Sequence, residues 1–234
     1  MAVRHVIGEG EVTRTDPRSE ARWREYEGII ASLVADGVDR LLDWGCGYGY
    51  VAAQMRKAGL SPVCYEFVPD VGAELRFHPG IEVIVSDNPV GLPFRDGEFE
   101  TALSLATLQH VQDKAGSLRE LHRVLRPGGR LYVFKLPNRL SWVEAAARLL
   151  GQPHMADGRY PFDELYTRRA AISLLMQNGF EVQWFRRTNM LPLTKLQRTL
   201  HLPGCWLWRA NRALERIPLA NVFCTDFALL GKAV

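Results

Sequence analysis

The sequence predicts an α/β fold built on a mostly parallel, doubly wound sheet with helices on both faces. Short apolar runs of strand length alternate with helical segments between residues 40 and 135. Such alternation is typical of right-handed crossovers that place the strands in one direction. A glycine-rich turn also joins the first of these strands directly to a helix, and open α/β sheets bind ligands at such turns.

The elements follow one another in a regular order up to Pro137. The first is an amphipathic helix over residues 19–35 that ends before Gly37. Strand-like runs then lie at Arg40–Asp43, Pro62–Glu66, Ile81–Val85, Thr101–Leu105 and Arg130–Lys135. Between them the pattern predicts helices at Tyr48–Lys57, near Asp70–Leu75 and at Ala115–Leu125, with a loop at Pro89–Glu98.

After Pro137 the alternation pauses and then resumes. Ser141 and Glu144 form a capping-box pattern that opens a helix to Leu150, and a loop with glycine and proline covers residues 151–161. The later elements are a helix at Thr167–Asn178, a strand that begins at Phe180 and an apolar strand at Val222–Leu230. The predicted strands number seven.

Composition limits the class of protein. A chain of 234 residues with 47% hydrophobic and 24% charged residues suits one soluble domain with a full core. No apolar run reaches the length of a membrane span and the first residues show no signal sequence, so we expect a cytoplasmic protein. The four cysteines show no C-x-x-C spacing, which predicts free thiols and no metal site.

The segment Leu41–Gly49 reads L-L-D-W-G-C-G-Y-G and carries three glycines at alternate positions. Glycine lets the backbone turn tightly and approach a ligand without a Cβ in the way. Asp43 stands two residues before the first glycine. Because its carboxylate only accepts hydrogen bonds, this turn suits a ligand with an ammonium group better than a pyrophosphate.

Three segments together resemble one enzyme family. Leu41–Gly49 resembles motif I of the class I S-adenosylmethionine-dependent methyltransferases. Leu92–Glu100 resembles the L-P-F-x-D-x-x-F-D segment of their small-molecule branch (methyltransferase type 11), with Glu100 in place of the usual Asp. Leu121–Gly129 resembles the R-V-L-K-P-G-G turn of that branch.

The resemblance implies a Rossmann-like sheet whose last strand returns antiparallel. It also implies S-adenosyl-L-methionine as the cofactor, S-adenosyl-L-homocysteine as the product, and no metal.

Three acids lie at the ends of consecutive predicted strands, namely Asp43, Glu66 and Asp87. A single acid at a strand end is more often a turn or cap residue, but ligands of open α/β sheets lie beyond these ends. The resemblance assigns the amino-acid tail of the cofactor to Asp43, the ribose hydroxyls to Glu66 and the adenine amino group to Asp87. It extends the cofactor site to the neighbouring residues Gly45, Cys46, Gly47, Gly49, Phe67, Asn88, Leu105 and Ala106.

Candidate catalytic and substrate residues lie near the same strand ends. His110 follows the fourth predicted strand and could act as the base for a hydroxyl nucleophile, or satisfy backbone groups of its own loop. His154 and Tyr160 lie between the fifth and sixth predicted strands, where the family places substrate-covering elements. Trp23 and Tyr26 of the first helix could close over the site or pack in the core.

The whole chain, residues 1–234, is predicted to be one methyltransferase domain. Residues 19–36 would form an N-terminal helix or lid, residues 39–136 the cofactor-binding core, and residues 138–166 and 188–216 substrate-covering insertions. The predicted function is methyl transfer to a small-molecule substrate, with O-methylation of a hydrophobic, lipid-linked or natural-product molecule preferred.

Two alternatives stay open, an RNA methyltransferase and a cofactor-binding protein without activity. Base-methylating enzymes carry an Asn/Asp-Pro-Pro-aromatic motif after strand four to grip a flipped base. Ser104–Thr107 stands at that position here, which disfavours nucleic acid as the partner.

Residues 190–216 combine basic side chains with leucines and with Trp206 and Trp208. This pattern fits a lid packed on its own domain. It also fits an amphipathic cap in peripheral contact with an anionic membrane surface. The two hypotheses differ in whether the tryptophans are buried or exposed.

Overall fold

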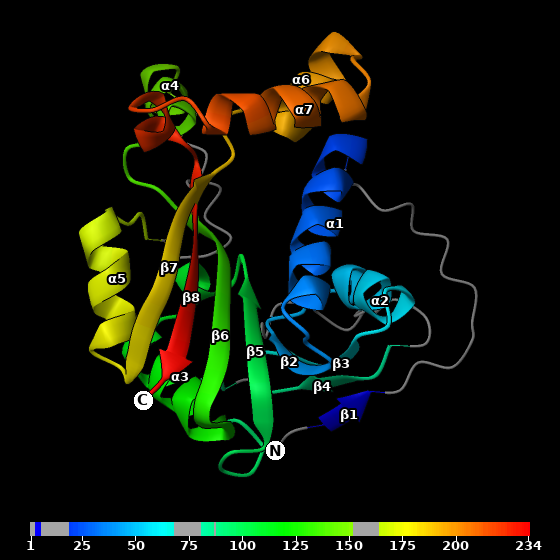
Figure 1. Cartoon of the computed structure of the whole chain (residues 1–234), viewed down its shortest axis with the longest axis vertical. Coiled ribbons are helices and arrows are strands. Elements are labelled where there is room, and N and C mark those ends of the chain that lie inside the picture. The colour runs from blue at the N-terminus through cyan, green and yellow to red at the C-terminus, as the bar shows by residue number, and fades with distance from the viewer. Residues whose placement is uncertain (1–2, 6–18, 68–80, 87, 152–163) are drawn as a thin grey trace.

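The computed structural model describes residues 3–5, 19–67, 81–86, 88–151 and 164–234 (Figure 1). Its centre is one sheet of eight strands in the order β1-β4-β3-β2-β5-β6-β8-β7. The strands are β1 (Val3–His5), β2 (Arg40–Trp44), β3 (Ser61–Glu66), β4 (Val83–Val85), β5 (Phe99–Leu105), β6 (Leu125–Pro137), β7 (Phe180–Thr188) and β8 (Asp226–Ala233).

The predicted doubly wound sheet is confirmed. Strands β2 to β6 pair in parallel, whereas β8 runs antiparallel to both β6 and β7. Seven of the strands correspond to the predicted ones. The eighth, β1, adds to the edge of the sheet antiparallel to β4, with Arg4 opposite Ile84, and was not predicted.

Helices cover both faces of the sheet and its carboxyl edge. They are α1 (Glu20–Ala35), α2 (Tyr50–Lys57), α3 (Lys114–Val124), α4 (Trp142–Leu149), α5 (Arg168–Met176), α6 (Leu193–Leu200) and α7 (Gly204–Glu215), with short 3-10 turns η1 (Leu108–His110) and η2 (Ala220–Phe223). Side-chain caps begin several of them, and the cap at Ser141 was predicted. Ser19 accepts a hydrogen bond from the Arg22 amide, and Ser141 accepts one from the Glu144 amide.

Alternation along the strands divides the core into two layers. In β5, Ala102 packs in the layer that contains α3 and α5, whereas its neighbour Leu103 packs in the layer that contains α1 and α2. Leu121 of α3 and Leu33 of α1 are fully buried in these two layers. The apolar face of each amphipathic helix therefore fixes on which side of the sheet it lies.

The second and third family-like segments contact each other through one side chain. Arg123 of α3 donates hydrogen bonds to the carbonyls of Leu92 and Phe94, and its guanidinium lies 2.6 Å from Asp96. Arg123 thus fastens the loop before β5 to the helix before β6.

Some predicted boundaries were wrong. The last strand begins at Asp226 rather than at Val222, because the Asn138 side chain binds the carbonyls of Val222 and Cys224 and holds them in a turn. Strand β6 begins at Leu125, directly after α3, rather than at Arg130. The helix predicted near Asp70–Leu75 lies outside the described residues.

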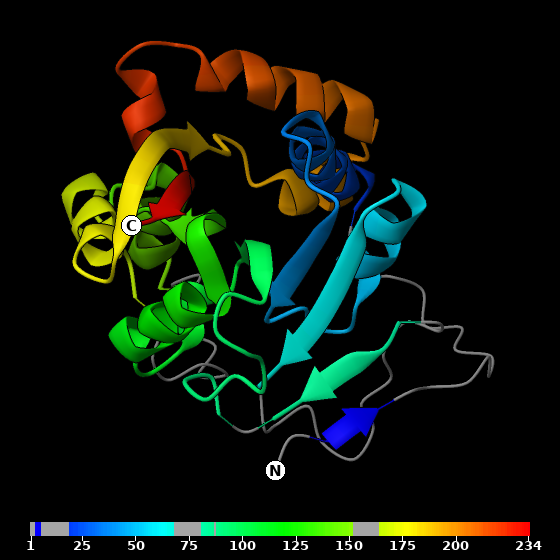
Figure 2. The same cartoon turned by 60° about the horizontal axis from the view of Figure 1, so that its bottom comes forward.

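Helices α6 and α7 lie over the carboxyl edge of the sheet (Figures 1 and 2), and residues 190–225, which contain them, are here called the cap. They pack on the N-terminal part of α1 through a small cluster in which Ala21, Leu193 and Leu207 are buried. The cap therefore stands over the sheet edge at which the predicted site residues lie. No helix within the described ranges is long and apolar enough to cross a membrane.

Candidate active site

The glycine-rich turn after β2 needs glycine for two different reasons. Gly45, Gly47 and Gly49 all have positive φ angles, of 78°, 57° and 77°. A Cβ on Gly45 would clash with the Thr107 side chain, so this glycine lets the turn pack against the loop after β5. A Cβ on Gly47 would meet nothing within 4 Å, so the backbone at Gly47 borders open space that a ligand could enter.

Two buried carboxylates flank this turn. Asp43, at 3% exposure, lies on β2, and Glu66, also at 3%, ends the neighbouring strand β3. The backbone amides of Gly47 and Phe67 donate to Glu66 at 2.6 and 2.9 Å, and a carboxylate accepts several hydrogen bonds at once. Burial and the charge of Glu66 raise the pKa of Asp43 to about 7. This pair of carboxylate acceptors fits a ligand that brings a positive charge to Asp43 and hydroxyl groups to Glu66.

The loop after β5 forms another wall of the turn. Thr107 Oγ1 lies 3.3 Å from the Gly45 carbonyl, and Ala106 takes a positive φ of 57° that a non-glycine residue rarely adopts. Cys46 and Leu105, both half-buried, pack on the core layer that contains α1 and α2. Thr107 is a site residue that the sequence reasoning missed.

The aromatic pair of α1 packs on the same layer as Cys46 and Leu105. Trp23 and Tyr26 are half-buried, and their rings meet edge to face at 5.6 Å. These side chains therefore contact the core, and their role in closing over the site stays a prediction.

The other predicted site residues have different surroundings. His110 is the last residue of the 3-10 turn η1 after β5. Its ring Nε2 lies 3.1 Å from the side-chain Nε2 of Gln109. The Asn88 side chain accepts a hydrogen bond from the Val90 amide, which is a local turn contact, and the backbone carbonyl of Asn88 accepts one from the Tyr65 hydroxyl. Asp87, His154 and Tyr160 lie outside the described residues.

A buried ionic cluster at the carboxyl edge was not predicted. Lys135 Nζ lies 3.0 Å from Glu25 of α1 and 3.2 Å from Asp226 of β8. The side-chain Nδ2 of Asn189 donates to both carboxylates at 2.6 Å, and Arg22 pairs with Glu25 at 2.7 Å. Two cations thus face two anions, and together they join α1, β6, β8 and the segment after β7.

The pKa values in this cluster show that its charges support one another. Burial would raise the pKa of Glu25, but Lys135 and Arg22, with the hydrogen bond from Asn189, lower it to about 2. Burial opposes the charge on Lys135, yet Asp226 and Glu25 keep its pKa above the ordinary value. The sequence offered one signal for this cluster. Lys135 is a charge within the apolar run Leu131–Leu136.

All four cysteines are free thiols, as predicted. Within the described ranges, no group of three or more His, Cys, Asp or Glu side chains could hold a metal ion.

Comparisons with known proteins agree with this geometry. Residues 42–133 match the methyltransferase domain family. The chain is 30% identical to O-methyltransferase resE of Aspergillus sclerotiorum over 214 residues, which cover 81% of this chain and 76% of that protein. It is 34% identical to a tRNA U34 carboxymethyltransferase of Methylococcus capsulatus over 150 residues, which cover 61% of this chain and 43% of that protein. The chain spans less than half the length of several further curated relatives.

Solved structures show the same fold. One is a SAM-dependent methyltransferase of Thermotoga maritima, described as a possible histamine N-methyltransferase, with a TM-score of 0.59 and 17% identity. The match covers 91% of this chain and 90% of that one. At this identity the likeness concerns the arrangement of strands and helices.

Proposed function

The chain belongs to the class I S-adenosylmethionine-dependent methyltransferases, and we propose that it methylates a hydroxyl oxygen of a small hydrophobic molecule. The observation that carries the proposal is the pair of buried carboxylates, Asp43 and Glu66, on either side of the glycine turn. Their chemistry matches the two polar ends that the cofactor presents near its sulfur, an ammonium group and a pair of ribose hydroxyls.

Each residue of the turn has a distinct role in this proposal. Asp43 would hold the ammonium group and Glu66 the ribose hydroxyls, while Gly47 leaves room for the ligand. Asp87 is proposed to accept from the adenine amino group. The bound cofactor supplies a methyl group activated by a sulfonium. The task of the protein is then to hold an acceptor oxygen in line with that methyl group, and such positioning can supply about 7–11 kcal/mol.

The acceptor side of the site would be formed by α1, the cap and the loop after β5. Trp23 and Tyr26 would exclude water from the acceptor, and His110 would take the proton that a hydroxyl releases. His154 and Tyr160 stay proposed substrate contacts on the segment between α4 and α5.

Oxygen as the acceptor atom is supported by a relative named an O-methyltransferase, resE, whose match to this chain covers 76% of its own length. RNA is the second candidate substrate, because a tRNA carboxymethyltransferase is also a relative and the cap is basic. That relative matches over a smaller share of its own length than resE does, 43% against 76%.

A labelling experiment separates the two substrates. We expect that the protein, given methyl-labelled S-adenosylmethionine, transfers label to hydroxyl-bearing hydrophobic compounds that partition into organic solvent, and leaves bulk tRNA unlabelled. A Glu66→Ala variant under the same conditions is the control for label that does not depend on the site. Label that appears only in the tRNA would contradict the proposal and establish the second candidate.

The raised pKa of Asp43 gives a second test. In the free protein this carboxyl group stays largely protonated below its pKa of about 7. A cationic ligand favours the charged form, so binding should release a proton at pH 6 and little at pH 8, by about one proton at most. Calorimetry of S-adenosylhomocysteine binding in buffers of different ionisation enthalpy counts this proton.

The affinity for S-adenosylhomocysteine should depend on pH over the same range in which binding releases a proton. It should rise by up to about tenfold per pH unit below the pKa and level off above it. An Asp43→Asn variant, which cannot titrate, should lose this dependence. Affinity that is flat with pH in the unaltered protein would show that Asp43 is already ionised or does not meet the ligand charge.

A further inference from the structure

The net positive charge of the cap is larger than the net charge of the whole chain. Residues 190–225 hold five cationic side chains against a single acid, Glu215, while the entire protein has a net charge of only +3. The cations are Lys195, Arg198, Arg209, Arg212 and Arg216. The side chain of Glu215 is only 7% exposed and already engaged, because it accepts from the Asn189 backbone amide, the Asn211 side chain and Arg212.

Three of these cations are directed to solvent without a counter-charge. Within the described part of the chain no ion pair involves Lys195, Arg209 or Arg216. All three are exposed. The outer surface of the cap is therefore strongly positive.

Large apolar side chains stand among these cations. Trp206 is 69% exposed and Leu219 is 84% exposed. On α7, Trp206, Arg209 and Arg216 recur at helical spacing and share one side of the helix. The further exposed apolar residues of this region are Leu200, Leu202 and Ile217.

These apolar side chains do not hold the cap in place, because the opposite side of α7 does so. Leu207 is buried against α1, and the Trp208 ring lies against Gly28 of α1 and under Arg212. The two tryptophans therefore have different environments, and each fits a different one of the two predicted interpretations. Trp208 is a packing residue, whereas Trp206 faces away from the domain.

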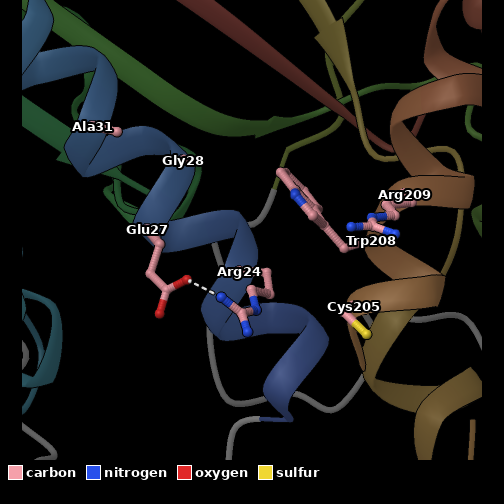
Figure 3. A pocket seen from close by; sticks show the side chains of 7 residues that line it. All are labelled: Arg24, Glu27, Gly28, Ala31, Cys205, Trp208 and Arg209. Carbon is pink, nitrogen blue, oxygen red and sulfur yellow. Dashed lines mark hydrogen bonds and ion pairs between the residues drawn. The ribbon is translucent and has the colours of Figure 1, made fainter. Parts of the chain in front are cut away.

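A hollow of about 450 Å³ opens between α1 and α7 (Figure 3). Its lining residues are Arg24, Glu27, Gly28, Ala31, Cys205, Trp208 and Arg209. Neither Asp43 nor Glu66 lines it, so it is separate from the proposed cofactor site. It places the exposed Arg209 beside the packed Trp208 at the rim of the cap.

We propose that the outer face of the cap, formed by Trp206, Arg209, Arg216, Ile217 and Leu219, binds the surface of a bilayer that contains anionic lipid. An amphipathic helix with cations and Trp or Leu side chains on its exposed side inserts its apolar groups at the level of the headgroups. Helix α7 runs across the end of the molecule (Figures 1 and 2), so its exposed side can lie along a flat surface.

A bilayer explains more of this surface than a nucleic acid does. Nucleic-acid backbones are bound by Lys and Arg and gain nothing from exposed aliphatic side chains such as Ile217 and Leu219. The inference does not depend on the methyl acceptor. It would, however, bring a hydrophobic acceptor close to the sheet edge over which the cap stands.

Vesicle sedimentation tests the proposal. We expect the protein to sediment with vesicles of equal parts phosphatidylglycerol and phosphatidylcholine, to bind phosphatidylcholine vesicles far more weakly, and to be released by high salt. The variant Arg209→Glu/Arg216→Glu should bind the anionic vesicles more than tenfold more weakly, since each cation near the surface contributes about a fivefold factor. The matched control Lys57→Glu/Lys232→Glu alters the net charge equally at positions outside the cap and should bind more tightly than that variant.

The two tryptophans provide an internal comparison. Trp206→Ala should weaken vesicle binding and leave the melting temperature and S-adenosylhomocysteine affinity unchanged, whereas Trp208→Ala should lower the melting temperature. Equal binding of both charge-reversal variants would overturn the proposal, as would equal binding to neutral and anionic vesicles. Binding of the unaltered protein to tRNA but not to vesicles would assign the face to nucleic acid. A dimer that dissociates in Trp206→Ala, without vesicle binding, would assign it to a second copy of the chain.

Discussion

Replacing Lys135 with methionine is expected to lower the free energy of unfolding by about 3–5 kcal/mol, the usual cost of removing one partner from a buried ion pair. Lys135 is the cation between Glu25 and Asp226, at 3.0 and 3.2 Å, and methionine keeps its length without its charge. Glu25 would keep Arg22, but Asp226 would lose the only cation that pairs with it in the described structure. Chemical denaturation followed by circular dichroism measures the loss.

Two further variants show whether the charge is responsible. Lys232→Met removes an exposed lysine from β8 and should change stability by less than about 0.5 kcal/mol. Lys135→Met combined with Asp226→Asn removes the unpaired charge as well and should be more stable than Lys135→Met alone. A single variant as stable as the unaltered protein would show that the cluster does not fasten α1 and β8 to β6.

The same cluster makes the fold sensitive to acid. Glu25 has a pKa lowered to about 2, below the ordinary value of 4.5, so its contribution is fully present above the ordinary pKa and is lost as the pH falls towards 2. Without Lys135 the pKa of Glu25 should rise. Acid unfolding of Lys135→Met should therefore begin at a higher pH than that of the unaltered protein.

Replacing Glu66 with alanine is expected to weaken S-adenosylhomocysteine binding by about 1.5–3 kcal/mol, or about 10- to 150-fold, the typical value for hydrogen bonds to a charged acceptor. The carboxylate accepts from the amides of Gly47 and Phe67, so its loss would also loosen the turn next to the ligand. Isothermal titration calorimetry gives the affinity directly.

A charge-neutral variant separates these two effects. Glu66→Gln keeps an acceptor oxygen for one amide but presents a donor where the carboxylate accepted, and it should still bind at least about tenfold more weakly. Glu100→Ala, which removes an exposed acid on β5, should leave the affinity unchanged. Unaltered affinity in both Glu66 variants would remove this residue from the cofactor site.

The sequence predicts the sheet well because its strands and helices alternate in regular apolar patterns. Leu103 and Leu121 are buried where the periodicity places them. The sequence predicts the ends of strands less well where contacts between side chains far apart in the chain decide the structure. The start of β8 depends on Asn138, which binds carbonyls 84 and 86 residues away. No local pattern around Val222 contains that information.

The candidate site also has parts that depend on local sequence and parts that depend on long-range contacts. The turn around Gly45, Gly47 and Gly49 could be predicted because its chemistry is local to a few residues. The packing of Thr107 on Gly45 joins residues 62 positions apart. The ionic cluster joins α1 with β6 and β8, and its members give only weak signals as single charges within apolar segments. Whether Trp206 and Trp208 were buried or exposed could not be decided from helical spacing, because it depends on how α7 meets α1.

The central claim is that Asp43, the glycine turn and Glu66 form the S-adenosylmethionine site, and a crystal structure of the protein with S-adenosylhomocysteine tests it most directly. The ligand is expected to lie along the glycine turn, with its ammonium group within hydrogen-bond distance of Asp43 and its ribose hydroxyls on Glu66. A ligand bound in the hollow between α1 and α7, or at any place where both carboxylates are left without contact, would contradict it.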